Sequence, residues 1–518
     1  MPPRCVTDLP DVTTGVFFCC YSPIYSMSDV PRLMSTQHPD NATLPFFVGG
    51  DVIEDEDEIQ EAYYVSSHLG CDEQMWDFEG KEGDQYAVKK LLSRYDEHFS
   101  DNRIGEDFRL TVRGPNPDVE GSEAKILLEI LESIPRSFDA AQLFAKDQDL
   151  PPVAPIHEVI IPMVTDAEQV NAVHEYYESF VAGKDSDEIW DGRTIEEWVG
   201  SFDPSAIGVI PLIEERDAML RAHEIVRDYA QAHDQDSVRV FLARSDPALN
   251  YGSVAADLIN KLALQRLYRM AEQTDIEIHP ILGAGSAPFR GNLTPNRAKA
   301  VTEAYPEVET FTVQSAFKYD YPVETVRDGI ETLRNAALGS APPPIDERQA
   351  LDIIDRTADA YGAQVDQIAT TVNRLSAHVP GRRARKLHVG LFGYSREVGE
   401  NALPRAIGYT ASLYSVGCPP TLLGAHALTD QDIAFLEDAF PSYFELLRDA
   451  ARYYNPRCTE LLPLDTEPLR TASELVEAET NEKHRLATNQ AIDAFQRGDE
   501  DALSSAIRRA ARERRFLG

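Results

Sequence analysis

Short apolar runs recur along the chain, and several of them end in a charged residue. Residues 207–213 are followed by Glu214, and residues 238–243 are followed by Arg244 and, two positions later, Asp246. Runs of this length with helical segments between them are typical of parallel strands that are buried on both faces. In barrels and doubly wound sheets, functional groups gather at the carboxyl ends of such strands. The pattern therefore predicts an α/β protein whose chemistry lies at one end of a parallel sheet.

Further segments have the length and apolar content of strands. The predicted strands are residues 108–113, 158–164, 207–213, 237–244, 276–282, 309–316, 387–392 and 420–425. Amphipathic helical segments lie between most of them, at residues 122–131, 166–183, 215–231, 253–273 and 296–305. This alternation implies a parallel sheet, and eight units favour a (β/α)8 TIM barrel over an open sheet. From residue 429 onward the pattern is almost wholly helical, so we expect additional α-helices and a helical C-terminal region.

The beginning of the chain differs in composition from the remainder. Cys5, Cys19 and Cys20 lie there, and charged residues are few. We expect residues 1–26 to be a misassigned or disordered N-terminal extension that precedes the true start at Met27. Residues 27–518 are expected to form a single barrel catalytic domain with helical insertions.

The net charge of the chain limits the classes of molecule that it is expected to bind. It has 87 acidic and 49 basic residues, for a net charge of −38. This excess argues against binding of nucleic acid through a broad basic surface. Because it is spread along the chain, it is typical of a surface adapted to high salt. The cysteines lack metal-ligand spacing and no apolar stretch reaches 18 residues, so a reduced, cytoplasmic protein without a membrane span is predicted.

Glu214 and Asp246 are the candidate metal ligands. Each follows a predicted strand, and they are about one strand–helix unit apart, so they are expected on neighbouring strands at one mouth of the barrel. Carboxylate oxygens suit Mg²⁺ or Mn²⁺, which usually take one or two protein carboxylates together with water and substrate. The alternative is that each acid caps the helix that follows it.

Arginines near strand ends and in loops are candidate anion ligands, because the planar guanidinium matches carboxylate and phosphate oxygens. They are Arg109, Arg113, Arg244, Arg290, Arg396 and Arg405. Arg290 lies among Gly283, Gly285 and Gly291, and glycines allow a backbone to approach a ligand closely. The alternative for each arginine is a surface ion pair. Together they indicate a phosphorylated carboxylate as substrate.

His38 is the candidate proton carrier. It precedes Pro39 in a polar segment, and a histidine held in this way can carry a proton or contact phosphate. The alternative is an ordinary loop residue. Residues 76–82 are rich in charge and aromatic rings and are interpreted as a turn. The chain has no Walker loop, dinucleotide fingerprint or nucleophile elbow.

Several motifs taken together resemble the archaeal type of phosphoenolpyruvate carboxylase. They are Met34-Ser35-Thr36-Gln37-His38-Pro39-Asp40-Asn41 and residues 58–64, 69–77, 243–248, 283–291 and 312–319. The resemblance covers roughly residues 27–518 and suggests a salt-adapted, haloarchaeon-like source. It implies a TIM barrel with additional helices, assembled as a homotetramer. It also implies irreversible, anaplerotic carboxylation of phosphoenolpyruvate by bicarbonate, with Mg²⁺ or Mn²⁺, to give oxaloacetate and phosphate.

The resemblance also implies roles for single residues. In the larger bacterial and plant relatives a Thr-Ala-His-Pro-Thr motif carries the essential histidine, and His38 is similarly placed. Their Pro-Leu-Phe-Glu-Thr and Gly-Tyr-Ser-Asp-Ser-Ala-Lys motifs supply metal ligands, which correspond here to Glu214 and Asp246. Leu249 stands where the second motif has lysine, and only Arg290 matches their two-arginine glycine loop. The implied catalytic residues are His38, Arg113, Arg244, Arg290 and Arg396, and the implied substrate-binding residues are Arg109, Gln314, Lys318 and Arg405. Gly518 resembles the buried C-terminal glycine of these relatives.

The implied reaction passes through carboxyphosphate and the enolate of pyruvate. His38 would take the proton of carboxyphosphate, and loops at residues 114–121 and 283–292 would close to exclude water. One alternative is another metal-dependent barrel enzyme that acts on an enolate, such as an aldolase or a citrate-lyase-like lyase. The other is a catalytically silent acidic scaffold.

Overall fold

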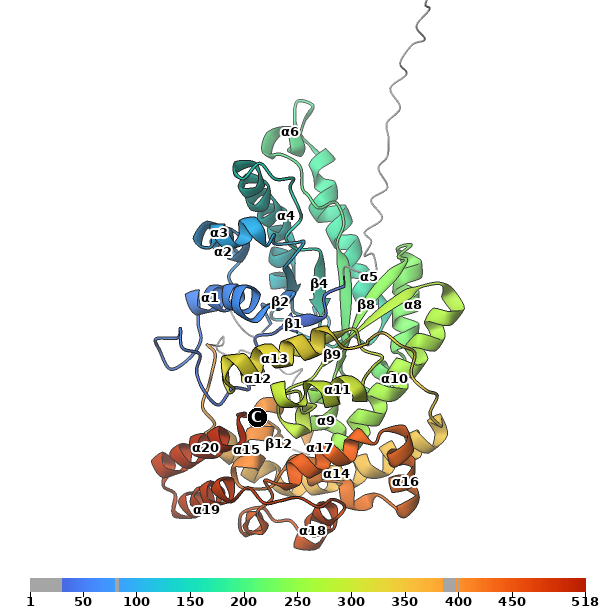
Figure 1. The fold of residues 1–518 in the computed structure, drawn as a ribbon. Coiled ribbons are helices and arrows are strands. Elements are labelled where there is room, and N and C mark those ends of the chain that lie inside the picture. The colour runs from blue at the N-terminus through green and yellow to red at the C-terminus, as the bar shows by residue number, and fades with distance from the viewer. Residues whose placement is uncertain (1–29, 80–82, 385–396, 399–400) are drawn as a thin grey trace, which may run out of the picture.

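The computed structural model describes residues 30–79, 83–384, 397–398 and 401–518. Within these residues, eight parallel strands close into a barrel in the order β1-β10-β9-β8-β7-β4-β3-β2 (Figure 1). The strands are β1 (Leu33–Ser35), β2 (Glu73–Asp77), β3 (Arg109–Arg113), β4 (Glu158–Ile161), β7 (Gly208–Ile213), β8 (Ser237–Ala243), β9 (Glu277–Gly283) and β10 (Thr310–Val313). The predicted TIM barrel is confirmed.

One of the predicted strands does not belong to this barrel, and another cannot be compared with it. Residues 420–425 were predicted as a strand, which is wrong: short 3₁₀ helices occupy Pro420–Leu422 and Ala425–Ala427. Proline there lacks the N–H that a ladder requires. Residues 387–392 lie outside the described residues.

The barrel instead begins earlier than predicted, with β1 and β2. β1 has only three residues, too few to show a period. β2 is fully buried although it begins with Glu73 and ends with Asp77, so it lacks the apolar run expected of a buried strand. Both strands lie inside the motifs that carry the family resemblance.

Helices up to α13 connect the strands or follow β10. They are α1 (Glu56–Tyr64), α2 (Ala87–Arg94), α3 (Asp96–Asp101), α4 (Ala124–Asp147), α5 (Ala167–Tyr176), α6 (Ile195–Val199), α7 (Arg216–Leu220), α8 (Ala222–Ala232), α9 (Ser245–Tyr251), α10 (Ser253–Thr274), α11 (Ala298–Ala304), α12 (Ser315–Tyr319) and α13 (Val323–Arg334). The hairpin of β5 (Glu188–Trp190) and β6 (Arg193–Thr194) leads into α6, which projects away from the barrel (Figure 1).

The C-terminal region is helical, as predicted. Its helices are α14 (Glu347–Ser376), α15 (Ala406–Ser415), α16 (Asp430–Ala439), α17 (Ser442–Ala451), α18 (Thr466–Glu474), α19 (Glu482–Arg497) and α20 (Glu500–Arg514). The short hairpin of β11 (Glu397–Val398) and β12 (Asn401–Ala402) precedes α15. In Figure 1 these orange and red helices lie together on one side of the barrel, and the C-terminus lies beside α15. The C-terminal helices thereby cover one end of the barrel.

Apolar side chains occupy much of the barrel interior and of the layer around it. Met34, Met75, Ile160, Phe241 and Ile281 belong to a separate buried cluster on the inner faces of the strands. Outside the barrel, most residues of α10 are buried, because the helix packs against the barrel, its helical neighbours and α14. In the described part of the chain, no helix combines the length and apolar character needed to cross a membrane.

Candidate active site

A pocket of about 350 Å³ lies at the carboxyl ends of the barrel strands. Residues at the carboxyl ends of β1, β2, β3, β7, β8, β9 and β10, or in the segments that follow them, line it from the barrel side. The opposite wall comes from residues 379–383, residues 404–408 at the start of α15, and Leu517. The pocket is therefore built between the barrel and its helical cover, where the sequence predicted the chemistry.

Glu214 and Asp246 both line this pocket. Glu214 is the first residue after β7, Asp246 lies in the first turn of α9 after β8, and these two strands pair directly. Glu214 Oε2 accepts a hydrogen bond of 3.1 Å from the Met163 backbone N–H. The two acids are thus neighbours at one mouth of the barrel, as predicted.

The electrostatic state of the two acids fits a cation site. Burial, followed by the nearby charge of Asp246, raises the pKa of Glu214 well above its usual value. Burial also raises the pKa of Asp246, while Arg290 acts in the opposite direction. A bound divalent cation would relieve this unfavourable charge. No group of three or more His, Cys, Asp or Glu suited to a metal occurs among the described residues, and the two carboxylates match the small protein share that Mg²⁺ usually takes.

Arg290 lies in the pocket wall that follows β9, and its side chain is almost fully buried. Its guanidinium donates to Ser245 Oγ at 3.1 Å, to Gln314 Oε1 at 2.8 Å and to the Gly518 carbonyl oxygen at 2.9 Å, and it also pairs with Asp40 at 3.2 Å. Arg290 therefore ties the loop after β9 to β10, to the segment after His38 and to the C-terminus. The predicted substrate contact of Arg290 and Gln314 is compatible with their place in the pocket lining.

The glycines around Arg290 serve this arrangement. A Cβ on Gly285 would lie 2.8 Å from the Arg290 guanidinium carbon, so a larger residue there would force the guanidinium to move from its present contacts. A Cβ on Gly518 would lie 2.1 Å from the Ile407 carbonyl oxygen, which makes the final residue equally restricted. The sequence predicted that glycines permit close approach, and the structure shows that the approaching group is an arginine of the protein itself.

Arg113 and Arg405 form an ion cluster with two acids at another side of the pocket. Arg113 binds Asp77 through two hydrogen bonds of 2.9 and 2.8 Å and contacts Glu79 Oε2 at 2.9 Å. Arg405, at the start of α15, lies 3.8 Å from Glu79 Oε1 and is partly exposed. Bidentate pairing fixes the Arg113 guanidinium at the pocket wall. Arg405 bridges the barrel and its helical cover.

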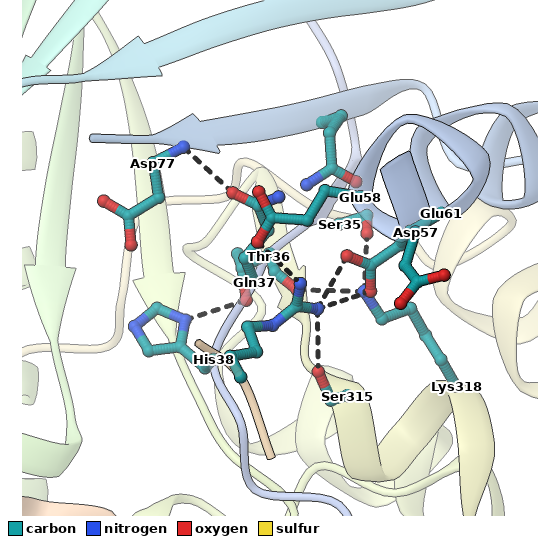
Figure 2. Close-up of polar contacts among 12 residues, drawn as sticks. Ser35, Thr36, Gln37, His38, Asp57, Glu58, Glu61, Asp77, Ser315 and Lys318 are labelled. Atoms are coloured by element: carbon teal, nitrogen blue, oxygen red, sulfur yellow. Dashed lines mark hydrogen bonds and ion pairs between the residues drawn. The ribbon is translucent and has the colours of Figure 1, made fainter. Parts of the chain in front are cut away.

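His38 also lines the pocket, on the segment that leaves β1. Its Nδ1 lies 2.8 Å from Thr36 Oγ1, and Figure 2 shows the other ring nitrogen on the far side of the ring from this contact. His38 is half-buried, whereas Thr36 is fully buried. The histidine is thus held by its own segment at the edge of the cavity.

The structure places some predicted site residues elsewhere or in other contacts. Arg109 begins β3 and lines a different cavity at the amino end of the barrel, so the prediction that it lies with the others is wrong. Arg244 lines the pocket, but its guanidinium binds Asp257 at 2.7 Å as well as Phe289 and Ser253.

Lys318 and Arg396 are the remaining predicted site residues. The ammonium group of Lys318 donates to Ser35 Oγ, the Thr36 carbonyl oxygen and Glu61 Oε1, each at 2.9 Å. These three acceptors match its three N–H donors, and Lys318 is absent from the pocket lining. Arg396 lies outside the described residues, so its prediction stays a prediction.

Three charged residues of the pocket were not predicted. Glu79 belongs to the segment interpreted as a turn, yet it is almost fully buried and lines the pocket. Arg382 and Arg383 line the opposite wall. Arg383 binds both carboxylate oxygens of Glu61, and Arg382 donates to the carbonyl oxygens of two residues in the segment after His38. A paired arginine directly after Gly381 was the available signal in the sequence.

Comparison with known proteins shows the family of the chain. The family model described as phosphoenolpyruvate carboxylase matches residues 30–518. The phosphoenolpyruvate carboxylase of Halobacterium salinarum is 77% identical over 492 residues, 95% of this chain and 100% of that protein. That of Methanothermobacter thermautotrophicus is 49% identical over 94% of this chain and 100% of its own length. The first of these relatives fits the expected haloarchaeon-like source.

A solved structure shares only a loose likeness with the chain. It is an HpcH/HpaI aldolase/citrate lyase family protein from Burkholderia cenocepacia J2315, 14% identical, with a TM-score of 0.31 over 59% of this chain and 96% of its own. A similarity this low supports no functional assignment. The family match and the relatives instead span nearly the whole described chain, and the chain belongs to the phosphoenolpyruvate carboxylase family.

Proposed function

We propose that this protein is a carboxy-lyase that converts phosphoenolpyruvate and bicarbonate into oxaloacetate and phosphate. The observation that carries the proposal is the shared pocket of Glu214, Asp246, His38, Arg113 and Arg290. It combines a pair of acids with raised pKa values, a proton carrier and fixed cations at the carboxyl end of a barrel. The names of the relatives support the same reaction.

Glu214 and Asp246 would hold the divalent cation, Mg²⁺ or Mn²⁺. When bound there, the cation supplies Lewis-acid chemistry to the oxygen atoms of the phosphorylated substrate. The raised pKa of each acid follows from burial in both cases, and for Glu214 from the proximity of Asp246. Burial and the proximity of the two acids both make the ionised carboxylates unfavourable without a cation, and so favour cation binding.

The arginines would orient two anions for reaction. Arg113 is fixed by Asp77, and Arg290 is fixed by its contacts with Asp40 and Gln314, so neither cation needs to reorganise. Arg405 is partly exposed at the opposite wall, where a substrate would enter. Positioning of this kind lowers the barrier because phosphoenolpyruvate and bicarbonate must meet in one geometry.

His38 would accept and return the proton that is transferred during the reaction. Attack of bicarbonate oxygen on the phosphoryl group breaks the phosphorus–oxygen bond of phosphoenolpyruvate and leaves carboxyphosphate and the enolate of pyruvate. His38 takes the carboxyl proton, the C–O bond to phosphate breaks, and CO₂ is released beside the enolate. The imidazolium can return the proton to phosphate. The carbon of the enolate then attacks CO₂ to give oxaloacetate.

The helical cover would keep water from the enolate, because a protonated enolate becomes pyruvate. The C-terminal residues close the pocket from the side opposite the strands, and the Gly518 carbonyl is bound by Arg290. In the segment at residues 114–121, Asn116 and Glu120 are already buried. The segment at residues 283–292 is bound to the C-terminus through Arg290. Both segments are proposed to complete the enclosure around the substrates.

The first experiment measures oxaloacetate in molar KCl with Mg²⁺, phosphoenolpyruvate and bicarbonate, coupled to malate dehydrogenase and NADH. Bicarbonate-dependent NADH oxidation together with phosphate release is expected. A folded protein that gives no oxaloacetate at any concentration of Mg²⁺ or Mn²⁺ would contradict the proposal and favour another barrel lyase.

His38→Asn tests the role of the histidine. Phosphate release should continue while oxaloacetate falls and pyruvate appears, because the phosphoryl step precedes the proton transfer. Equal loss of phosphate and oxaloacetate would argue against this role. The family resemblance also supports a cytoplasmic homotetramer, and sedimentation in molar KCl tests the assembly.

A further inference from the structure

The backbone on either side of His38 is held by buried charge. On one side, the Thr36 N–H donates to the Val313 carbonyl oxygen at 3.1 Å, which extends the pairing of β1 with β10. The Thr36 carbonyl oxygen accepts from Lys318 Nζ at 2.9 Å. On the other side, the Asp40 carboxylate accepts from the Ala316 N–H at 2.7 Å and pairs with Arg290.

Lys318 belongs to an ion cluster that lies beside the segment of His38 (Figure 2). Its partner Glu61 is fully buried and also accepts from Tyr319 at 2.5 Å and from Arg383 at 2.7 and 2.6 Å. Arg383 contacts Glu58 as well, at 3.3 Å. Two acids thus balance two cations away from water, which makes the cluster rigid and intolerant of a missing partner.

The ring of His38 is held by the same segment. Nδ1 lies 2.8 Å from Thr36 Oγ1, and Thr36 is fully buried. A proton that His38 takes from a substrate must enter at Nε2 if Nδ1 already carries hydrogen. A threonine hydroxyl can accept a hydrogen bond from Nδ1–H in both the neutral and the protonated ring. In the tautomer that carries hydrogen on Nδ1, the hydroxyl can keep this hydrogen bond through the whole proton transfer.

We propose that Thr36 is a positioning residue for His38, and that Lys318 holds Thr36 in place through its carbonyl oxygen. The hydroxyl of Thr36 fixes the ring through Nδ1, and it leaves Nε2 as the atom that exchanges the proton of carboxyphosphate. This inference rests on the proposed function, because it assigns a purpose to contacts around the proposed proton carrier. It also replaces the predicted substrate contact of Lys318 with a supporting one.

The experiment compares Thr36→Val with the wild-type protein. Phosphate, oxaloacetate and pyruvate are measured in parallel, the last two with malate and lactate dehydrogenase. Without the hydroxyl the ring samples other rotamers and the second tautomer, so oxaloacetate formation should fall about 10-fold or more. Phosphate release should fall less than about 3-fold, with the difference recovered as pyruvate. A role limited to folding would lower all products together and leave their ratio unchanged.

Thr36→Ser and Thr36→Ala form a matched pair for the case that valine disturbs folding. Both lack the γ-methyl group and differ only in the hydroxyl. Serine should keep the wild-type ratio of oxaloacetate to pyruvate, and alanine should shift it toward pyruvate. In a His38→Asn background Thr36→Val should add no further shift, because both changes act through one ring. An additional shift would overturn the inference.

Lys318→Met separates support from substrate contact. A supporting role predicts a shift toward pyruvate with the KM for phosphoenolpyruvate within about 2-fold of wild type. A rise in that KM with an unchanged product ratio would restore the substrate contact and contradict the inference. Failure of the proposed function is distinct from both results, because the wild-type protein would then form no bicarbonate-dependent oxaloacetate.

Discussion

Buried charged side chains are arranged differently at the two ends of the barrel. At the amino end they form pairs of opposite charge, and at the carboxyl end two acids lie close together. At the amino end, Arg239 lies inside the barrel and binds Glu73 at 2.8 and 2.9 Å and Glu158 at 2.8 Å. The side chains of Arg239 and Glu73 are 0% exposed, and that of Glu158 is 6% exposed. At the carboxyl end, Glu214 and Asp246 lie close enough to disfavour each other's charge.

This difference separates structural charge from functional charge. A buried ion pair with satisfied hydrogen bonds is stable in place, although it adds little net stability over apolar side chains. Two like charges in a buried site are unfavourable until a ligand compensates them. The barrel therefore has a closed charge cluster at one end, and at the other end a site that becomes favourable when a cation binds.

The largest effect should come from breaking the carboxyl-end pair. Glu214→Gln and Asp246→Asn each remove a proposed cation ligand and should lower kcat/KM about 1,000-fold, which is about 4 kcal/mol of transition-state stabilisation. The metal concentration for half-maximal activity should rise sharply in both variants. Titration of Mg²⁺ and Mn²⁺ by coupled assay measures it, and an unchanged titration curve would remove these residues from the site.

The same substitution at both ends gives the matched control. Without metal, Glu214→Gln should leave the urea midpoint unchanged or higher, because it removes a carboxylate whose charge is disfavoured. Glu158→Gln should lower the free energy of unfolding by about 1–2 kcal/mol, and with it the midpoint, because Arg239 loses a charged partner. An equal loss of unfolding free energy in both variants would contradict the proposed difference between the two ends of the barrel.

Arg239→Met is expected to affect stability alone, and more strongly than Glu158→Gln does. It removes the guanidinium that binds the buried carboxylates of Glu73 and Glu158, which should cost about 3 kcal/mol or more of unfolding free energy. Urea unfolding in molar KCl measures the loss. Addition of Glu73→Gln and Glu158→Gln to this variant should recover most of it. The KM for phosphoenolpyruvate should stay unchanged, and a rise would mean that the amino end is coupled to the site.

The sequence predicted the carboxyl end far better than the amino end. Glu214 and Asp246 follow apolar strands, so their place at the mouth follows from strand direction alone. The triad around Arg239 could not be predicted from a pattern. Glu73 lies in a strand without an apolar run, and its partners are distant in sequence. The same difficulty applies to Arg109, which begins β3. Unless the boundaries of the strand are known, the sequence does not tell at which end of the barrel such an arginine lies.

The contacts of individual arginines could not be predicted from the sequence pattern either. Arg244 and Arg290 both follow barrel strands, yet one binds Asp257 and the other joins the C-terminus to the pocket. Which contacts an arginine makes depends on groups far along the chain, as Gly518 shows for Arg290. The family resemblance supplied what periodicity lacked, since it covered β1 and β2 without needing them to look like strands.

The smallest expected effect concerns Glu120, which extends the acid-rich surroundings of the carboxyl end. Burial, followed by the charge of Glu79, raises the pKa of Glu120 to about 7. Because the unfolded chain loses this proton at a lower pH than the folded chain, Glu120 lowers stability as pH rises from about 4.5 to about 7. Above pH 7 the loss is complete and constant.

Glu120→Gln removes that loss while it can still accept the hydrogen bond that Glu120 Oε2 takes from the Asn116 N–H. Its unfolding free energy should therefore exceed that of the wild-type protein by about 1 kcal/mol at pH 8, with screening by solvent included, and should match it near pH 4.5. Urea midpoints across this range, without added metal, measure the difference. Glu129→Gln, on the exposed face of α4, is the control and should show no such trend. A gain for Glu120→Gln that is independent of pH would indicate improved packing instead, and would separate Glu120 from the charge imbalance that distinguishes the two ends of the barrel.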